Sequence, residues 1–252
     1  MPAFDYSLLA DVYDKFVKTD LDVAFFLDES EGISGGVLEL MCGTGRLSMP
    51  LLAAGVPLTC VDSSPEMLAQ LRRKLAESGY SAEVVEQDVV HLTLPRRYEL
   101  ALVPFNSFSE VIAIQDEISA LESIHRCLTA EGRLIVTLHS PAVRLKRIDG
   151  LPHTMGPFSL DEKGKSFTVT LTEAFDPPTR LVTGHEVLTA HDVAGTLLWQ
   201  RDIPITFRLL SLVELEGMAV KAGFTIDSLY GDYDRSPYVS AVSPFIISTL
   251  KA

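Results

Sequence analysis

A short apolar run that ends in two closely spaced glycines constrains this chain more than any other feature. Residues 37–40 read Val-Leu-Glu-Leu, as expected of a strand buried inside a sheet. They lead through 41–46, Met-Cys-Gly-Thr-Gly-Arg, into helical periodicity at 47–54. Because glycine has no Cβ atom, the backbone at Gly43 and Gly45 can bend tightly and a ligand can approach its N–H groups. The stretch predicts a ligand-binding turn between a strand and a helix, with an ordinary connecting turn as the alternative.

Strand-like and helix-like segments alternate after this turn. Further strands are expected at 58–61, 83–86, 99–103, 134–138, 225–230 and 245–250, and helices at 6–16, 21–27, 64–76, 116–128 and 212–222. Such alternation predicts a parallel sheet covered by helices on both faces. We therefore expect an α/β fold: a Rossmann-like, seven-stranded, mostly parallel sheet whose final strand is antiparallel.

The character of the sequence changes between 144 and 208. Threonine- and valine-rich runs at 167–175, 181–190 and 197–207 are separated by turn residues, which is typical of antiparallel hairpins. We interpret 144–208 as an antiparallel β insertion, or cap, within one domain of residues 1–252, and 1–30 as a helical cover.

Composition favours a small-molecule partner. The chain has 252 residues, 47% of them hydrophobic, and a formal net charge of −13, which disfavours nucleic acid and anionic membranes. Cys42, Cys60 and Cys127 have neither disulfide-framework nor metal-ligand spacing. No apolar run reaches the roughly 18 residues that span a bilayer. We expect a soluble, cytoplasmic protein without a metal site.

Acidic residues follow the second and third predicted strands. Asp62 comes directly after one strand and can accept hydrogen bonds from both hydroxyls of a ribose, or it caps the next helix. Asp88 follows the other strand and can accept from an adenine amino group, or it is a solvent-exposed loop residue. Ser63 and Val89 adjoin these acids and are assigned to the same site.

Glu39 separates two classes of cofactor. A dinucleotide fingerprint requires a third glycine at the position of Ser48. Glu39 places a negative charge beneath the turn, which suits a cofactor carrying an ammonium and a sulfonium better than a pyrophosphate. An NAD(P)-dependent oxidoreductase remains the alternative enzyme, and a non-catalytic S-adenosylmethionine-binding domain is the alternative without catalysis.

These motifs resemble the class I S-adenosylmethionine-dependent methyltransferases, with Met41 in place of the usual first glycine of the turn. The resemblance implies S-adenosyl-L-methionine as cofactor and places Asp62 at the ribose, with Met67 and Asp88 at the adenine. The pattern Tyr6…Tyr13-Asp14 and Arg46 resemble a small-molecule subgroup that includes amino-sugar and glycine N-methyltransferases. In that subgroup the amino-terminal helices close over the cofactor, which puts Tyr13 and Arg46 at its methionine end.

Residues after the fourth and fifth predicted strands are assigned to the region of methyl transfer. Phe105 and Asn106 follow the fourth strand, where the transferred methyl group faces its acceptor in the family. Both are assigned to cofactor binding: Phe105 excludes water, and Asn106 orients the cofactor or the acceptor. His139 ends the fifth strand and is the histidine best placed to remove a proton, or it is simply a hydrogen-bonded strand-end residue. We expect direct methyl transfer to a nitrogen or oxygen of a small molecule. The insertion supplies acceptor selectivity in this interpretation, with homodimer formation as its alternative role.

Overall fold

A seven-stranded mixed sheet forms the centre of the computed structural model, which describes residues 4–252. Its strand order is β10-β11-β5-β4-β1-β2-β3. The strands are β1 (Val37–Leu40), β2 (Leu58–Asp62), β3 (Glu83–Glu86), β4 (Tyr98–Val103), β5 (Leu128–His139), β10 (Thr225–Tyr230) and β11 (Phe245–Lys251). β11 runs antiparallel to both of its neighbours, whereas β1 to β5 pair in parallel. The predicted fold class is confirmed.

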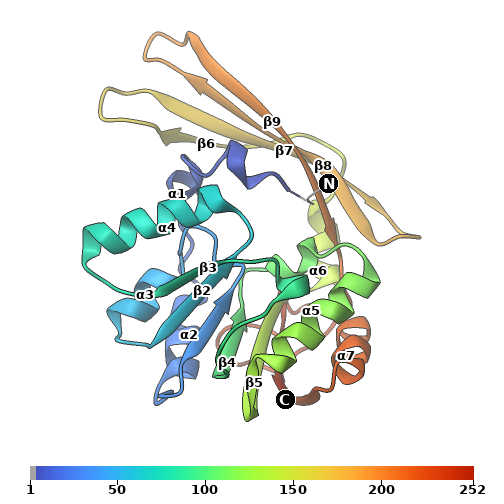
Figure 1. Ribbon diagram of the computed structural model, residues 1–252. Coiled ribbons are helices and arrows are strands. Elements are labelled where there is room, and N and C mark those ends of the chain that lie inside the picture. Colours follow the sequence, from blue (N-terminus) through green and yellow to red (C-terminus); the bar gives the residue numbers. More distant parts are fainter. Residues whose placement is uncertain (1–3) are drawn as a thin grey trace.

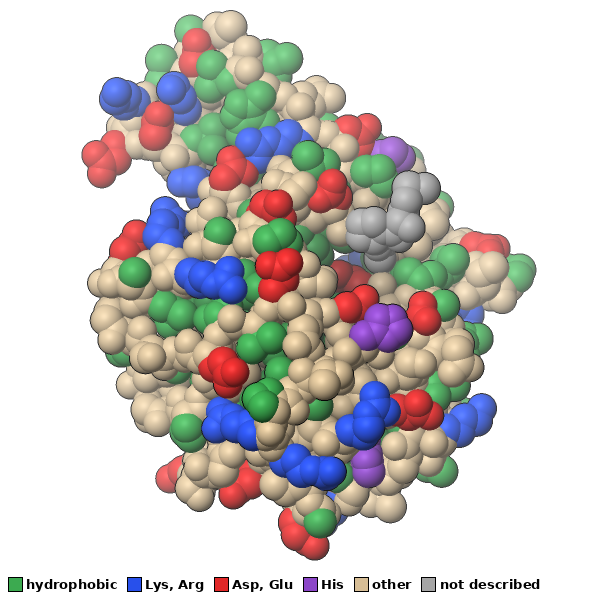
Figure 2. Space-filling model, in the orientation of Figure 1, with side chains coloured by type: hydrophobic (Ala, Val, Ile, Leu, Met, Phe, Trp, Pro, Cys, Tyr) green, Lys and Arg blue, Asp and Glu red, His purple; other side chains and the backbone are tan. Residues whose placement is uncertain are grey.

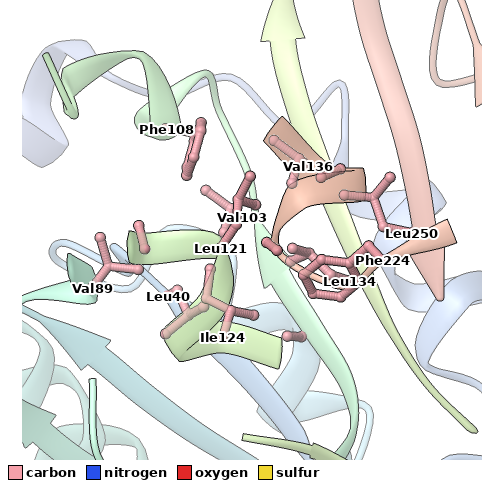
Figure 3. Close-up of a cluster of buried hydrophobic side chains, with 14 of the residues drawn as sticks. Leu40, Val89, Val103, Phe108, Leu121, Ile124, Leu134, Val136, Phe224 and Leu250 are labelled. Atoms are coloured by element: carbon pink, nitrogen blue, oxygen red, sulfur yellow. The ribbon is translucent and has the colours of Figure 1, made fainter. Parts of the chain in front are cut away.

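Helices cover the two faces of this sheet with separate apolar clusters. The helices are α2 (Val23–Ser30), α3 (Ser48–Ala53), α4 (Pro65–Ser78), α5 (Ile114–Arg126) and α7 (Leu212–Lys221). Residues of α5 and α7 pack on one face, where Leu121 and Ile124 lie against the sheet (Figure 3). Residues of α2, α3 and α4 pack on the other face. Because successive side chains of a strand point to opposite faces, a near-continuous apolar strand such as β1 serves both clusters.

A second sheet is formed by the insertion. It has four antiparallel strands in the order β6 (His153–Ser159), β7 (Ser166–Asp176), β8 (Leu181–His191) and β9 (Leu197–Arg208). β7, β8 and β9 correspond to the predicted hairpin strands. β6 was not predicted because Gly156 and Pro157 interrupt its sequence and its pairing with β7 is irregular there. The second sheet lies apart from the helix-covered sheet in Figure 1.

The amino-terminal segment departs from its prediction. The single helix expected over 6–16 is wrong: a 3-10 turn, η1 (Tyr6–Leu8), and a one-turn helix, α1 (Tyr13–Phe16), take its place. Leu9 and Val12 lie between them and are buried against Phe167 and its neighbours on the second sheet. This contact dominates over local helix propensity, and the segment consequently runs between the two sheets (Figure 1). Residues 1–3 of the predicted 1–30 cover lie outside the described residues.

Candidate cofactor and acceptor site

A cavity of about 510 Å³ opens at the carboxyl ends of β1 to β4, beneath the amino-terminal segment. This is the edge of an open α/β sheet where ligands bind. Eleven of the predicted site residues line it: Tyr13, Glu39, Met41, Gly43, Arg46, Asp62, Ser63, Met67, Asp88, Val89 and Phe105. The sheet topology therefore brings together residues that are far apart in the sequence.

The glycine turn lies at the centre of this cavity wall, but its two glycines have different roles. Gly43 lines the cavity, and its backbone N–H donates to the Asp62 carboxylate at 2.7 Å. Gly45 does not line it: a Cβ atom there would lie 2.4 Å from the Leu71 side chain of α4. A side chain at Gly45 would therefore meet α4 rather than a ligand in the cavity, so Gly45 does not contribute to the cavity wall as the sequence analysis expected. Met41 has φ 56°, the left-handed conformation that favours glycine.

Asp62 is oriented by two backbone donors. Its carboxylate accepts from the N–H of Gly43 at 2.7 Å and from the N–H of Ser64 at 2.9 Å. Burial raises its pKa, and these hydrogen bonds act in the opposite direction. The Ser64 hydroxyl, rather than Asp62, accepts from Met67 N–H at the start of α4. Because each carboxylate oxygen has two lone pairs, Asp62 retains acceptors for ligand hydroxyls.

Asp88 lines the same cavity and follows β3, the neighbour of β2. It accepts from Val90 N–H at 2.9 Å and begins the 3-10 turn η2 (Val89–His91). Met67 and Val89 are buried residues that line the same cavity. A cavity lined by apolar side chains and two carboxylates matches the chemistry of an adenosine, which has a flat aromatic base and several hydrogen-bond donors.

Arg46 is held in place by a partner that the sequence analysis missed. Its guanidinium makes a two-pronged ion pair with buried Asp22, with both N···O distances at 2.6 Å, and lies 4.4 Å from the centre of the Phe105 ring. Tyr13 lines the cavity on the amino-terminal side, and burial raises its pKa above the ordinary range. Arg46 has five N–H donors, so it can contact an anionic group while remaining paired with Asp22.

Glu39 lies beneath the turn, as expected. It accepts a hydrogen bond from the Ser48 hydroxyl at 2.6 Å, and burial raises its pKa to about 8. A carboxyl group in such a place is stabilised as an anion when a cationic group binds next to it.

Asn106 and His139 are not among the residues that line the cavity. The Asn106 side chain accepts from the His139 backbone N–H at 2.8 Å and from the Ser109 hydroxyl at 3.0 Å, which fixes the loop after β4 to β5. The His139 ring stacks on Phe245 with centroids 5.6 Å apart. Burial lowers its pKa to about 4. The structure thus gives both residues structural contacts and does not support His139 as the base.

The structure adds cavity-lining residues that the sequence analysis did not assign. Glu110, in the 3-10 turn η3 (Ser107–Glu110), lines the cavity together with Tyr6 and Asp116. The Tyr6 hydroxyl donates to Glu110 at 2.5 Å although 104 positions separate the two residues. No local signal marks this pair, because only the path of the amino-terminal segment brings Tyr6 to η3.

Other site classes find no support within residues 4–252. Three or more metal-ligating side chains do not gather at any point there. None of the helices in this part of the chain is long and apolar enough to cross a membrane. On the face shown in Figure 2, lysine and arginine side chains are interspersed with acidic ones.

Comparisons with known proteins agree with this geometry. A family model described as "Methyltransferase domain" matches residues 37–132. The cypemycin N-terminal methyltransferase of a Streptomyces species is 28% identical over 205 residues, covering 81% of this chain and 78% of that protein. Three further relatives match over about half of this chain, which spans less than half of the length of each.

Two solved structures share the fold along almost the whole chain. An S-adenosylmethionine-dependent methyltransferase from Clostridium acetobutylicum has a TM-score of 0.80 at 19% identity, covering 98% of both chains. The sugar N-methyltransferase KedS8 from a Streptoalloteichus species has a TM-score of 0.72 at 18% identity, covering 94% of this chain and 90% of that one.

Together these findings identify the chain as a class I S-adenosylmethionine-dependent methyltransferase. Its cofactor is S-adenosylmethionine, and the nicotinamide and non-catalytic alternatives are not retained. The cavity fits this cofactor. Among residues 4–252, Glu39 is a buried carboxyl group without a cationic hydrogen-bond partner, and Asp62 is oriented at the sheet edge with acceptors to spare.

Proposed function

We propose that this protein transfers a methyl group to a nitrogen atom of a small-molecule amine. The observation that carries the proposal is the acidic lining of the acceptor side, where Glu110 and Asp116 face the cavity. Carboxylates favour a cationic amine over a neutral hydroxyl compound. The similarity to the cypemycin N-terminal methyltransferase and to the sugar N-methyltransferase KedS8 supports a nitrogen acceptor.

The proposed cofactor contacts follow from the cavity wall. Asp62 and Ser63 hold the ribose, while Met67, Asp88 and Val89 hold the adenine. The methionine end lies near Tyr13, Glu39, Met41, Gly43 and Arg46, with Phe105 beneath the Arg46 guanidinium. Gly45 supports this arrangement from behind by leaving room for Leu71 of α4.

The chain's contribution to the reaction is positioning and exclusion of water. Bound S-adenosylmethionine supplies a methyl group activated by a sulfonium, which a neutral nitrogen takes by direct displacement. Tyr6, Tyr13 and Phe105 enclose this part of the cavity. Holding two reactants in an aligned geometry can supply about 7–11 kcal/mol of the barrier in favourable cases.

We also propose that the 1–30 segment covers the site and that the 144–208 insertion acts through it, within a single domain of 1–252. None of the residues that line the cavity belongs to 144–208. Instead, the second sheet packs against Leu9, Val12 and Phe16, on the segment that carries Tyr6 and Tyr13. Acceptor selectivity from the insertion is therefore indirect in this proposal.

The test uses matched acceptors and labelled S-adenosylmethionine. Pairs of small molecules that differ only in an amine or a hydroxyl group are incubated with the purified protein, and methylated products are identified by mass spectrometry. Label is expected on amines. Label exclusively on hydroxyl compounds would overturn the nitrogen assignment and leave the methyltransferase class intact.

A further inference from the structure

The pair formed by Glu110 and Tyr6 has no role in cofactor binding as proposed above. Glu110 follows β4 on η3, and its carboxylate faces the cavity while accepting the Tyr6 hydroxyl hydrogen at 2.5 Å. The side chains come from opposite walls of the cavity, one from the sheet edge and one from the amino-terminal cover. They are therefore joined only when the cover is in place.

We propose that Glu110 binds the protonated amine of the acceptor and accepts its proton before methyl transfer, with Tyr6 as the residue that positions the Glu110 carboxylate. This inference rests on the proposed function and deepens it, because it assigns the acceptor site and the cationic form in which the acceptor arrives.

The charge environment of Glu110 supports a cationic ligand. Two other buried carboxylates, which lie outside the cavity, have cationic partners: Asp22 pairs with Arg46, and Glu117 pairs with Arg208 at 2.6 Å. The only side chain in the described part of the chain that hydrogen-bonds to Glu110 is the neutral Tyr6. A buried carboxylate without a cation is costly, and an ammonium entering the cavity would remove that cost.

The groups around Glu110 also favour proton transfer near neutral pH. Burial raises the pKa of Glu110 to about 7, the Tyr6 hydrogen bond acts to lower it, and the Asp62 charge adds to the rise. Tyr13 is close to both members of the pair: its ring centroid lies 6.2 Å from that of Tyr6, and the Glu110 charge adds to the effect of burial in raising the Tyr13 pKa. A general base is most effective when its pKa lies near the operating pH.

The step balances without any further reactant. The ammonium gives one proton to the Glu110 carboxylate and becomes a neutral amine. The amine lone pair then forms the new C–N bond while the C–S bond of the sulfonium breaks, and its electrons remain on sulfur. The products are a methylated ammonium, S-adenosylhomocysteine and a protonated Glu110, which returns its proton to water after the products leave.

The test compares Glu110→Gln and Tyr6→Phe with the wild type, using an amine that the wild type methylates. Glu186→Gln is the matched control. Glu186 is also an enclosed carboxyl group, and burial raises its pKa to about 7, but this residue does not line the cavity. Calorimetry measures the affinity for S-adenosylhomocysteine, and then for the amine in the presence of S-adenosylhomocysteine. Kinetics give kcat and kcat/KM from pH 6 to pH 10.

Glu110→Gln is expected to keep the wild-type affinity for S-adenosylhomocysteine, to bind the amine more weakly at pH 7, and to lose roughly 100-fold in kcat/KM, in the range of general-base effects. Activity should recover above the pKa of the free amine, where the acceptor arrives neutral. Tyr6→Phe should shift the acidic limb of kcat toward higher pH, because the hydrogen bond that lowers the Glu110 pKa is lost. A merely structural role would not produce that shift. Glu186→Gln should keep the wild-type acidic limb, because Glu186 influences the Tyr13 pKa but is not among the groups that shift the Glu110 pKa.

A wild-type pH profile and amine affinity in Glu110→Gln would overturn the inference while leaving the proposed function standing. A wild type that methylates no amine but does methylate hydroxyl compounds would instead reject the proposed function. An equal loss in Glu110→Gln and Glu186→Gln would also overturn the assignment, since it would indicate a general effect of buried carboxyl groups.

Discussion

Alanine substitutions at Gly45 and Gly43 change the same turn but should affect different properties. Gly45→Ala should mainly lower stability, and Gly43→Ala should mainly lower the affinity for the cofactor. Both glycines have positive φ, 84° at Gly45 and 57° at Gly43, and an L-residue in that conformation costs about 1–2 kcal/mol. At Gly45 the added Cβ would also lie 2.4 Å from fully buried Leu71, and such overpacking typically costs about 1–3 kcal/mol. We expect Gly45→Ala to lower the free energy of unfolding by about 2–5 kcal/mol in total.

Gly43→Ala should be milder in stability and more severe in binding. Its Cβ would lie 3.3 Å from the terminal methyl of Met67, in the wall of the cavity itself. We expect a loss of about 1–2 kcal/mol in unfolding free energy and an affinity for S-adenosylhomocysteine reduced at least tenfold, while Gly45→Ala keeps near wild-type affinity.

Urea unfolding of the ligand-free variants and calorimetry at a temperature where both are folded measure the two quantities separately. If Gly45→Ala unfolds like the wild type, or loses more affinity than Gly43→Ala, the division of roles within the turn is wrong.

Four further substitutions examine other parts of the site. Asp62→Ala should weaken S-adenosylhomocysteine binding by roughly 1–3 kcal/mol, the range for hydrogen bonds to a charged group. If calorimetry shows unchanged affinity and circular dichroism shows a native fold, Asp62 is not part of the site. Arg46→Ala leaves the Asp22 carboxylate buried without its partner, so urea unfolding should show a loss of roughly 3–5 kcal/mol, and Arg46→Lys should lose less. Burial raises the pKa of Glu39 to about 8 in the folded state, against an ordinary value of 4.5. The folded state therefore holds this proton more tightly than the unfolded state, and the ligand-free protein should lose stability as pH rises from about 4.5 to 8. Thermal unfolding of Glu39→Gln should show a weaker dependence of stability on pH over this range. Phe167 is buried beneath the amino-terminal segment and lies outside the cavity. Phe167→Ala should lower the affinity for S-adenosylhomocysteine, because it weakens the packing that holds Tyr6 and Tyr13 in place. Val182 is buried in the same sheet but outside that cluster, so Val182→Ala should leave the affinity unchanged.

The central sheet could be predicted because its signals are local. β1 is a buried run of four residues, three of them apolar, and α4 begins with a capping serine and a proline, so each element is defined within a few positions of the sequence. Residues at the carboxyl ends of neighbouring parallel strands must then meet at one edge. That geometric rule placed Asp62 and Asp88 in the same wall without any knowledge of the structure.

Contacts between distant segments could not be predicted in this way. The partner of Arg46 is Asp22, and the partner of Glu110 is Tyr6, and both depend on where the amino-terminal segment crosses the sheet. His139 was chosen because it ends a strand at the correct edge. The orientation of its ring, which stacks on Phe245, depends on β11 and could not be derived from strand periodicity.

The second sheet explains why the amino-terminal segment is not one helix. A helix over 6–16 would present a single apolar stripe, but this segment has two surfaces to satisfy. Leu9 and Val12 are buried against the second sheet, whereas Tyr6 and Tyr13 face the cavity. Asp14 adds a third attachment, since it accepts from the Thr44 hydroxyl and pairs with Lys74 at 2.6 Å each. A short turn on either side of Leu9 and Val12 satisfies all three sets of contacts, and the insertion thereby influences the cavity through residues that it contacts but does not contain.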